Sequence, residues 1–283
     1  MRKSLSLRMF PPEMDTLRRL DLAREAGFQG VEVNLEPWQE YSLASSDDEL
    51  TALRRAIEGR GLCVSTVYDR EQWHFPMSSR DPAVRSRCSA IIAGLCRAAA
   101  ILGSDAVLVM PGAVDNRILA PQPEIVPYDV AYRNAIQVLA QLAETCEQYH
   151  VRLAAENCPS KFLISPLEFA RFLDEIGSSW VGACFDTGNA LCYGFPEHWI
   201  PILGSRIYLI HLKDVRVVMQ GAVTPTPLLA GDVDWPAVRE ALAATGYDGW
   251  LTAEVFPPYS FHPERLICET ATAIDAIFDL AGS

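Results

Sequence analysis

The chain has 283 residues, of which 49% are hydrophobic and 21% charged, so long disordered segments are not expected. Its formal net charge is −12 and it has no basic stripe, which argues against nucleic acid or an anionic membrane surface as a partner. The amino-terminal apolar stretch is too short for a secretory signal, and no run approaches the roughly 18 apolar residues of a membrane span, so we expect a cytoplasmic protein.

Short apolar runs alternate with longer amphipathic stretches along the chain. Strands are predicted over 4–8, 30–34, 62–67, 106–110, 151–156, 181–185, 207–211 and 250–255. Helices are predicted over 12–26, 46–60, 82–102, 128–149, 166–176, 197–203, 234–245 and 263–280. The helix boundaries rest on start signals, such as Ser46 followed by three acidic residues, and on stop signals such as Gly27.

Eight strands, each followed by a helix, indicate a parallel sheet covered by helices. Eight such units close most naturally as a (β/α)₈ TIM barrel of the α/β class, forming one domain over residues 1–283. A doubly wound open sheet is the alternative, but it would require a glycine-rich phosphate turn, and neither GxGxxG nor a P-loop is present. The loops 112–127 and 214–232 are long enough to cover an active site.

Eight cysteines occur in the chain, and none forms a CxxC pair. Most lie inside apolar runs, which is typical of buried, reduced thiols in a cytosolic protein.

Potential metal ligands stand at the ends of four consecutive predicted strands: Glu156, Asp186, His211 and Glu254. In a TIM barrel, reactive side chains lie at the carboxyl ends of the strands. Three carboxylates gathered without a cation would repel one another and raise their pKa values, and a divalent cation would remove that conflict. An oxygen-rich set with one nitrogen suits Mn²⁺, Mg²⁺, Co²⁺ or Zn²⁺. Each residue alone has a plainer reading, because a single strand-end glutamate is more often a salt-bridge partner.

Other polar and aromatic residues near the strand ends are candidates for binding substrate: Asn157, Asn189, Lys213, Arg216, Trp73 and His74. The second and third strands also offer Glu32, Asn34 and Tyr68. Lys213 and Arg216 could equally be solvated charges, and His74 could simply pack in its loop.

Five segments resemble the xylose-isomerase-like TIM-barrel superfamily, and within it the sugar-phosphate isomerase/epimerase group: AAEN (154–157), CFDTGN (184–189), HLKD (211–214), GDVDW (231–235) and GYDGWLTAE (246–254). The resemblance runs in order through nearly the whole chain and is strongest from 151 to 256.

In ketose 3-epimerases of this group, one metal ion is held by Glu, Asp, His and Glu, which fall here on Glu156, Asp186, His211 and Glu254. The resemblance implies that the metal, with Mn²⁺ expected first, binds the ketose carbonyl and stabilises an enediolate. One of the two glutamates would remove the proton from carbon 3, and the other would return a proton to the opposite face. The expected activity is therefore that of a metal-dependent isomerase of carbohydrate metabolism, an epimerase acting on a small sugar or sugar phosphate.

One departure concerns the sixth strand, where many relatives carry DxGH and this chain has Asn189 in place of the histidine. The combination of DxGN with HxKD is similar to pentulose-5-phosphate 3-epimerases of the group. It favours a phosphorylated or acidic sugar, with Lys213 as a partner.

Three alternatives remain open. An aldose–ketose isomerase or an inosose-type dehydratase would use the same site. An apurinic endonuclease would require more histidines than the five present and a basic DNA-facing surface. A non-enzymatic sugar-binding barrel would not need a carboxylate on each side of the ligand. Association into homo-oligomers is also left open, with the loops near Phe195 and Trp199 as candidate contacts.

Overall fold

Parallel strands close into a barrel in the computed structural model of the chain, which describes residues 1–117, 123–219 and 222–280. Within those residues, eight strands pair in the closed order β1-β10-β7-β6-β5-β4-β3-β2, and every pair is parallel. They are β1 (Arg2–Ser6), β2 (Gly30–Asn34), β3 (Cys63–Tyr68), β4 (Ala106–Val109), β5 (Arg152–Glu156), β6 (Val181–Asp186), β7 (Ile207–Leu212) and β10 (Trp250–Ala253). The predicted TIM barrel is confirmed.

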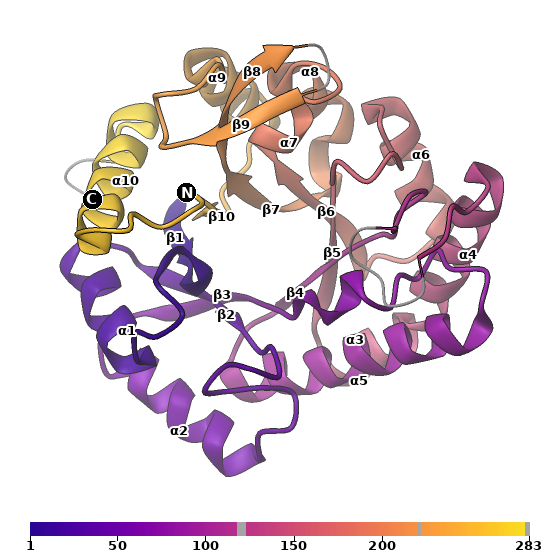
Figure 1. Cartoon of the computed structure of the whole chain (residues 1–283), viewed down its shortest axis with the longest axis horizontal. Helices are drawn as coiled ribbons and strands as arrows, with labels where there is room; N and C mark the ends of the chain where they lie inside the picture. Colours follow the sequence, from indigo (N-terminus) through magenta and orange to yellow (C-terminus); the bar gives the residue numbers. More distant parts are fainter. Residues whose placement is uncertain (118–122, 220–221, 281–283) are drawn as a thin grey trace.

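Helices form a ring around this barrel (Figure 1). They are α1 (Thr16–Glu25), α2 (Asp47–Glu58), α3 (Pro82–Leu102), α4 (Tyr128–Gln141), α5 (Ala143–Tyr149), α6 (Pro166–Ile176), α8 (Pro196–Leu203), α9 (Trp235–Thr245) and α10 (Pro263–Phe278). Shorter turns are η1 (Leu7–Met9), η2 (Arg70–Trp73), α7 (Thr187–Ala190) and η3 (Gly204–Arg206). At α2 the Ser46 hydroxyl accepts from the Glu49 N–H while the Glu49 carboxylate accepts from the Ser46 N–H, which is the capping box that the sequence predicts.

The predicted loop over 214–232 contains an antiparallel ribbon, so its assignment as loop alone is wrong. Strands β8 (Asp214–Met219) and β9 (Ala222–Thr226) pair with Arg216 opposite Thr224. The buried Asp214 carboxylate anchors the ribbon, because it accepts from the Trp235 indole N–H at 3.0 Å and from the Gly231 N–H at 3.1 Å. The ribbon is therefore tied to the start of α9.

Apart from shifts of one or two residues at other boundaries, three further elements differ from the prediction. Helix α1 begins at Thr16 rather than Pro12, because the Asp15 carboxylate caps it by accepting from the Arg18 N–H at 2.9 Å. The helix predicted over 128–149 is divided at Leu142, whose N–H bonds to both Val138 and Leu139 carbonyls at 3.2 Å, so the backbone tightens before α5 begins. The first strand ends at Ser6 rather than Arg8, because residues 7–9 form the η1 turn. Arg8 consequently lies beyond the strand. Of the predicted loop 112–127, residues 118–122 lie outside the described part of the chain.

Two apolar clusters fill the molecule. The larger one packs barrel strands against the helices. The smaller one includes alternate residues of β4, namely Ala106 and Leu108, with Ala154, Cys184 and Leu209 from β5, β6 and β7, and this alternation places it inside the barrel. Among the described residues, this packing fills the barrel interior with apolar side chains, and the polar strand-end side chains lie at its mouth.

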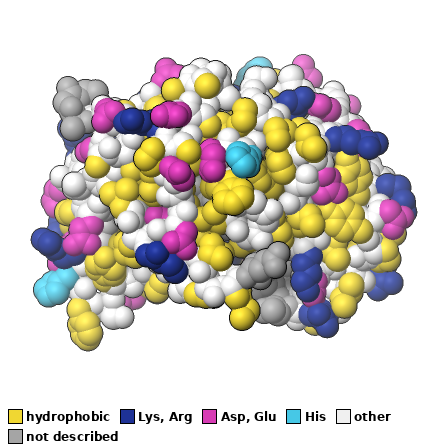
Figure 2. Space-filling view, turned by 90° about the horizontal axis from the view of Figure 1, so that it is seen from above, with side chains coloured by type: hydrophobic (Ala, Val, Ile, Leu, Met, Phe, Trp, Pro, Cys, Tyr) yellow, Lys and Arg dark blue, Asp and Glu magenta, His cyan; other side chains and the backbone are white. Residues whose placement is uncertain are grey.

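All eight thiols are free, as predicted, and five of them are buried. Among the residues that the structure describes, no helix combines the length and apolarity needed to cross a bilayer. On the face in Figure 2, basic side chains are interspersed with acidic ones rather than gathered in a stripe.

Candidate metal and active site

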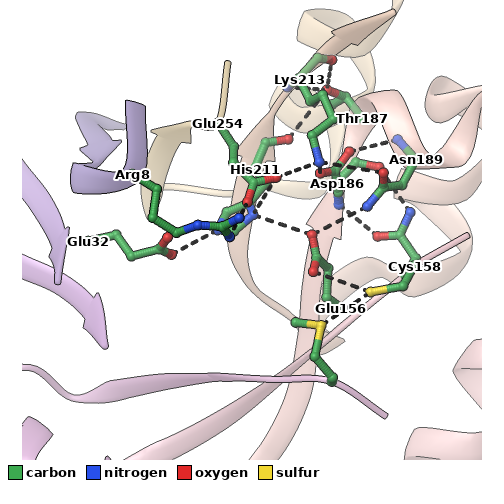
Figure 3. A network of polar contacts seen from close by, with 12 residues as sticks. Arg8, Glu32, Glu156, Cys158, Asp186, Thr187, Asn189, His211, Lys213 and Glu254 are labelled. Atoms are coloured by element: carbon green, nitrogen blue, oxygen red, sulfur yellow. Dashed lines mark hydrogen bonds and ion pairs between the residues drawn. The ribbon is translucent and has the colours of Figure 1, made fainter. Parts of the chain in front are cut away.

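The barrel brings together the four side chains singled out at the strand ends (Figure 3). Glu156 ends β5, Asp186 ends β6, His211 lies in β7, and Glu254 directly follows β10. One ligand atom from each lies within 4.8 Å of all the others. All four side chains are buried, with at most 6% of any residue exposed. Because neighbouring parallel strands end at the same rim, sequence positions nearly 100 residues apart converge on one point.

Lys213 lies inside this cluster. Its ammonium is 2.8 Å from Asp186 Oδ2 and also pairs with Glu254 Oε2. Burial and the neighbouring glutamates raise the pKa of Asp186 to about 7, against the opposing effect of Lys213. Burial would also raise the pKa of Glu254, but Lys213, His211 and Arg8 together lower it to about 2. The repulsion among the three carboxylates is therefore relieved unevenly, because the Lys213 ammonium forms ion pairs with Asp186 and Glu254.

The ring of His211 is oriented by the carboxylate of Glu32. Its Nε2 lies 3.1 Å from Glu32 Oε2, and both side chains are fully buried. Burial would lower the pKa of His211, but Cys184 and Glu32 raise it further than burial lowers it. When Nε2–H is donated to Glu32, the Nδ1 lone pair faces the cluster, 3.5 Å from Glu156 Oε1 and 3.9 Å from Glu254 Oε2.

The donor set fits a divalent cation. Within the described residues, His211 Nδ1 and Asp186 Oδ2 are buried atoms without a hydrogen bond, although Asp186 Oδ2 faces the Lys213 ammonium. Both atoms belong to side chains of the four-residue cluster. Three carboxylates and one imidazole nitrogen suit Mn²⁺ and similar ions. The glutamate oxygens, Asp186 and His211 could therefore hold one metal ion.

Neighbouring groups fix the two ends of the Glu156 carboxylate. Asn189 Nδ2 donates to Glu156 Oε1 at 3.3 Å, and the Cys158 thiol donates to Oε2 at 3.3 Å. The Asn189 N–H in turn donates to Asp186 Oδ1 at 2.7 Å, which caps the short helix α7. The Asn189 amide and the Cys158 thiol together restrict the Glu156 carboxylate to one orientation, and the Asp186 cap holds Asn189 in place.

The remaining predicted substrate contacts are divided between the cluster and other places. Asn189 and Lys213 are in the cluster. Asn157 is beside it, but both of its amide atoms bond to the Asp186 backbone, at 2.9 and 2.7 Å, so it clamps β5 to β6. Arg216 lies on β8 with 55% of its side chain exposed and pairs with Asp232 at 2.7 Å.

The predicted pair Trp73 and His74 lies in and just after the η2 turn that follows β3. Trp73 is half-buried and packs against the smaller apolar cluster, which includes Tyr68. Neither residue contacts the cluster of four ligands through a hydrogen bond or ion pair among the described residues.

Sequence reasoning missed two contacts of the glutamates. Arg8 Nη1 lies 3.7 Å from Glu254 Oε1, and the Cys158 thiol contacts Glu156. Arg8 was the last residue of the predicted first strand, so the rule that strand ends carry the site pointed to it. No comparable signal pointed to Cys158, because a cysteine in an apolar run reads as core.

Comparison with known proteins identifies the family that the sequence motifs resemble. The profile of the xylose isomerase-like TIM barrel family matches residues 20–277. A protein of Escherichia coli (strain K12) named as a candidate L-ribulose-5-phosphate 3-epimerase, SgbU, is 26% identical over 278 residues, covering 93% of this chain and 92% of the relative.

Two solved structures share the fold. An L-ribulose 3-epimerase superposes with a TM-score of 0.80 at 20% identity, covering 98% of this chain and 94% of that one. The IOLI protein with a bound zinc atom superposes with a TM-score of 0.82 at 16% identity, covering 99% of this chain and 98% of that one.

Proposed function

This chain belongs to the xylose isomerase-like TIM barrel family, and on that premise we propose that it is a metal-dependent ketose 3-epimerase with Glu156 and Glu254 as its acid–base pair. It is an isomerase-type enzyme, in keeping with relatives named as L-ribulose-5-phosphate 3-epimerase. The observation that carries the proposal is the convergence of four buried ligand atoms within 4.8 Å at the barrel mouth. The ketose or ketose phosphate is its proposed partner, and Mn²⁺ its proposed ion.

The positions of the two glutamates suit an epimerisation. Along the barrel the strands run β10, β7, β6, β5, so Glu254 and Glu156 are the outer members of the four. By this strand order they come from either side of the strands that carry Asp186 and His211. A carboxylate on each side can remove a proton from one face of a carbon and return one to the other face, which is the change that inverts carbon 3.

The residues around the glutamates hold these roles in place. A divalent ion bound by the four side chains would supply Lewis-acid polarisation of a carbonyl. Glu32 directs His211 Nδ1 toward the cluster, Asn189 and Cys158 fix Glu156, and Lys213 and Arg8 lie at the two oxygens of Glu254. Each glutamate oxygen therefore has an assigned neighbour, so the proton-carrying groups are held rather than free to rotate.

Solvent deuterium incorporation tests the function. Metal-stripped protein is given Mn²⁺ in D₂O together with ketopentoses, ketohexoses or their phosphates, and NMR follows the substrate. We expect metal-dependent exchange at carbon 3 with appearance of the epimer. Exchange at carbon 1 would indicate an aldose–ketose isomerase, and loss of water would indicate a dehydratase. Tight Mn²⁺ binding with no exchange in any of these sugars would contradict the proposal.

A further inference from the structure

A group of buried polar atoms at the ends of β1 and β2 has no partner. Within the described residues, Ser6 Oγ, Glu32 Oε1, Glu36 Oε2 and both amide atoms of Asn34 lack a hydrogen bond. Ser6 is opposite Glu32 in the β1–β2 register, and Asn34 is opposite Tyr68 in the β2–β3 register. Glu32 reaches His211 across the barrel, so strand alternation places Asn34 on the same inward face, one layer nearer the mouth.

Arg8 completes this group. Its guanidinium lies over the rings of Tyr68 and Phe256, 5.6 and 4.9 Å from their centres. Its carboxylate neighbours are Glu254 Oε1 at 3.7 Å and Glu36 Oε1 at 3.9 Å. Both separations exceed hydrogen-bonding distance, and 26% of the side chain is exposed. The Arg8 guanidinium therefore lies against aromatic faces and near two carboxylates, and its planar N–H donors make no hydrogen bond to the described residues.

Unpaired buried polar atoms destabilise a fold unless a ligand or water pairs with them. The group therefore offers donors from Arg8 and Asn34 and acceptors from Asn34 and Glu36, and two aromatic rings lie beside Arg8. Hydroxyl groups both donate and accept, so a row of them matches such a surface. The group also adjoins the proposed metal site, since Arg8 faces Glu254 and Glu32 holds His211.

The charges around this group disfavour a phosphate. Arg8 is already faced by two carboxylates, and the Lys213 ammonium is shared between Asp186 and Glu254. The N-terminus of the short helix α7 could have attracted an anion, but the Asp186 carboxylate caps it. Arg70 also lies near enough to Glu36 to oppose the rise that burial causes in the pKa of that carboxyl. A dianionic group near Arg8 would nevertheless lie beside the carboxylates of Glu36 and Glu254, whose charges oppose it.

We propose that Arg8, Asn34 and Glu36 form a subsite for the hydroxyl-bearing tail of the substrate, and that this enzyme acts on an unphosphorylated ketose. The inference rests on the proposed function and extends it by naming the substrate class. Here the structure departs from the sequence-based expectation that Lys213 would select a phosphorylated or acidic sugar, because Lys213 is engaged within the ligand cluster.

The test compares substrates that share the reacting part and differ in the tail. Deuterium exchange is measured with Mn²⁺-loaded protein on ribulose, ribulose 5-phosphate and dihydroxyacetone, which has the carbonyl and both flanking carbons but no tail. For the wild type we expect a higher kcat/KM for ribulose than for its phosphate. In Asn34→Ala and in Arg8→Met, the ratio of kcat/KM for ribulose to that for dihydroxyacetone should fall by about tenfold, as expected for one lost hydrogen bond. Arg133→Met is the matched control, because Arg133 is an exposed arginine on α4.

A structural role for Asn34 would give a different result. Because its amide has no partner, Asn34→Ala should not lower the melting temperature. A lower melting temperature with an unchanged substrate ratio, or a preference of the wild type for ribulose 5-phosphate, would overturn the inference and leave the epimerase assignment intact. Absence of exchange in all three compounds would overturn both.

Discussion

Single side chains at the barrel mouth have distinguishable surroundings, because each oxygen of the two glutamates faces a different neighbour. Glu254 has Lys213 at one oxygen and Arg8 at the other, whereas Glu156 has an amide and a thiol. Two carboxylates of the same residue type therefore experience unlike fields. Such differences commonly separate an acid from a base within one site.

Replacing Glu254 by glutamine tests its role in proton transfer. Gln keeps the shape and one metal-binding oxygen but cannot accept and release a proton, so Glu254→Gln should retain the fold and most Mn²⁺ binding. Turnover should fall at least about 100-fold, the usual contribution of a general acid or base. Exchange kinetics and Mn²⁺ titration measure the two quantities separately. Near wild-type turnover would remove Glu254 from the acid–base pair, and Glu25→Gln on the exposed face of α1 is the control.

Glu32 offers a second test, of metal affinity rather than of turnover. It fixes the ring of His211 through Nε2, so Glu32→Ala should weaken Mn²⁺ binding by about 10–100-fold, the usual effect of removing such a partner. Glu32→Gln retains an acceptor oxygen and should lose less. Calorimetric titration with Mn²⁺ would reveal both values. Equal affinity in all three proteins would mean that packing alone orients His211.

Among the elements, the η2 turn is capped by a buried carboxylate, that of Asp69, which directly precedes its first residue. The Asp69 carboxylate caps this turn by accepting from the Glu71 N–H at 2.8 Å, but its Oδ2 is buried without a partner. Burial raises the pKa of Asp69 to about 7, against the effect of the cap. Between the unfolded value near 4 and about 7, the folded state therefore holds the additional proton. This contribution to the free energy of unfolding is present at low pH and is lost as pH rises through the folded pKa.

Asp69→Asn should remove this pH dependence. The amide oxygen can still accept from Glu71 N–H, while the buried charge is gone. At pH 8 we expect the variant to be more stable than the wild type by on the order of 1 kcal/mol, with the difference vanishing near pH 4. Urea unfolding at several pH values measures this. Parallel stability curves for both proteins would contradict it, and Asp129→Asn on the exposed start of α4 is the control.

Element by element, the sequence predicted what periodic burial determines. Strand β2 and helices α3 and α6 begin and end where the pattern of apolar residues does. The ribbon β8–β9 was not predicted, because four of the six residues of β8 are exposed and Pro225 lies within β9. The sequence therefore shows no alternation of apolar and polar residues there. The η1 turn was not predicted either, because three residues are too few to show a helical period of apolar residues. The four strand-end ligand candidates could be named from sequence, and the same strand-end rule could have pointed to Arg8, the last residue of the predicted first strand.

For the whole molecule, the ligand cluster joins four strands of the barrel that are far apart in sequence. Without a metal, the Lys213 ammonium pairs with both Asp186 and Glu254, and His211 and Arg8 add further positive charge near Glu254. A divalent ion bound by the same carboxylates would compete with this ammonium. Metal binding and folding stability should therefore be coupled through Lys213.

Lys213→Met measures that coupling. In the presence of a chelator, the variant should be less stable than the wild type by about 3–5 kcal/mol, because buried carboxylates lose their cation. Saturating Mn²⁺ should restore most of this loss, so the gain in free energy of unfolding on adding Mn²⁺ should be larger in the variant. Thermal unfolding with and without Mn²⁺ gives the four values required, and Lys161→Met, at an exposed lysine paired with Asp115, is the control. If Mn²⁺ stabilised both proteins equally, the ammonium and the ion would not share these carboxylates, and the metal would have to be held elsewhere at the barrel mouth.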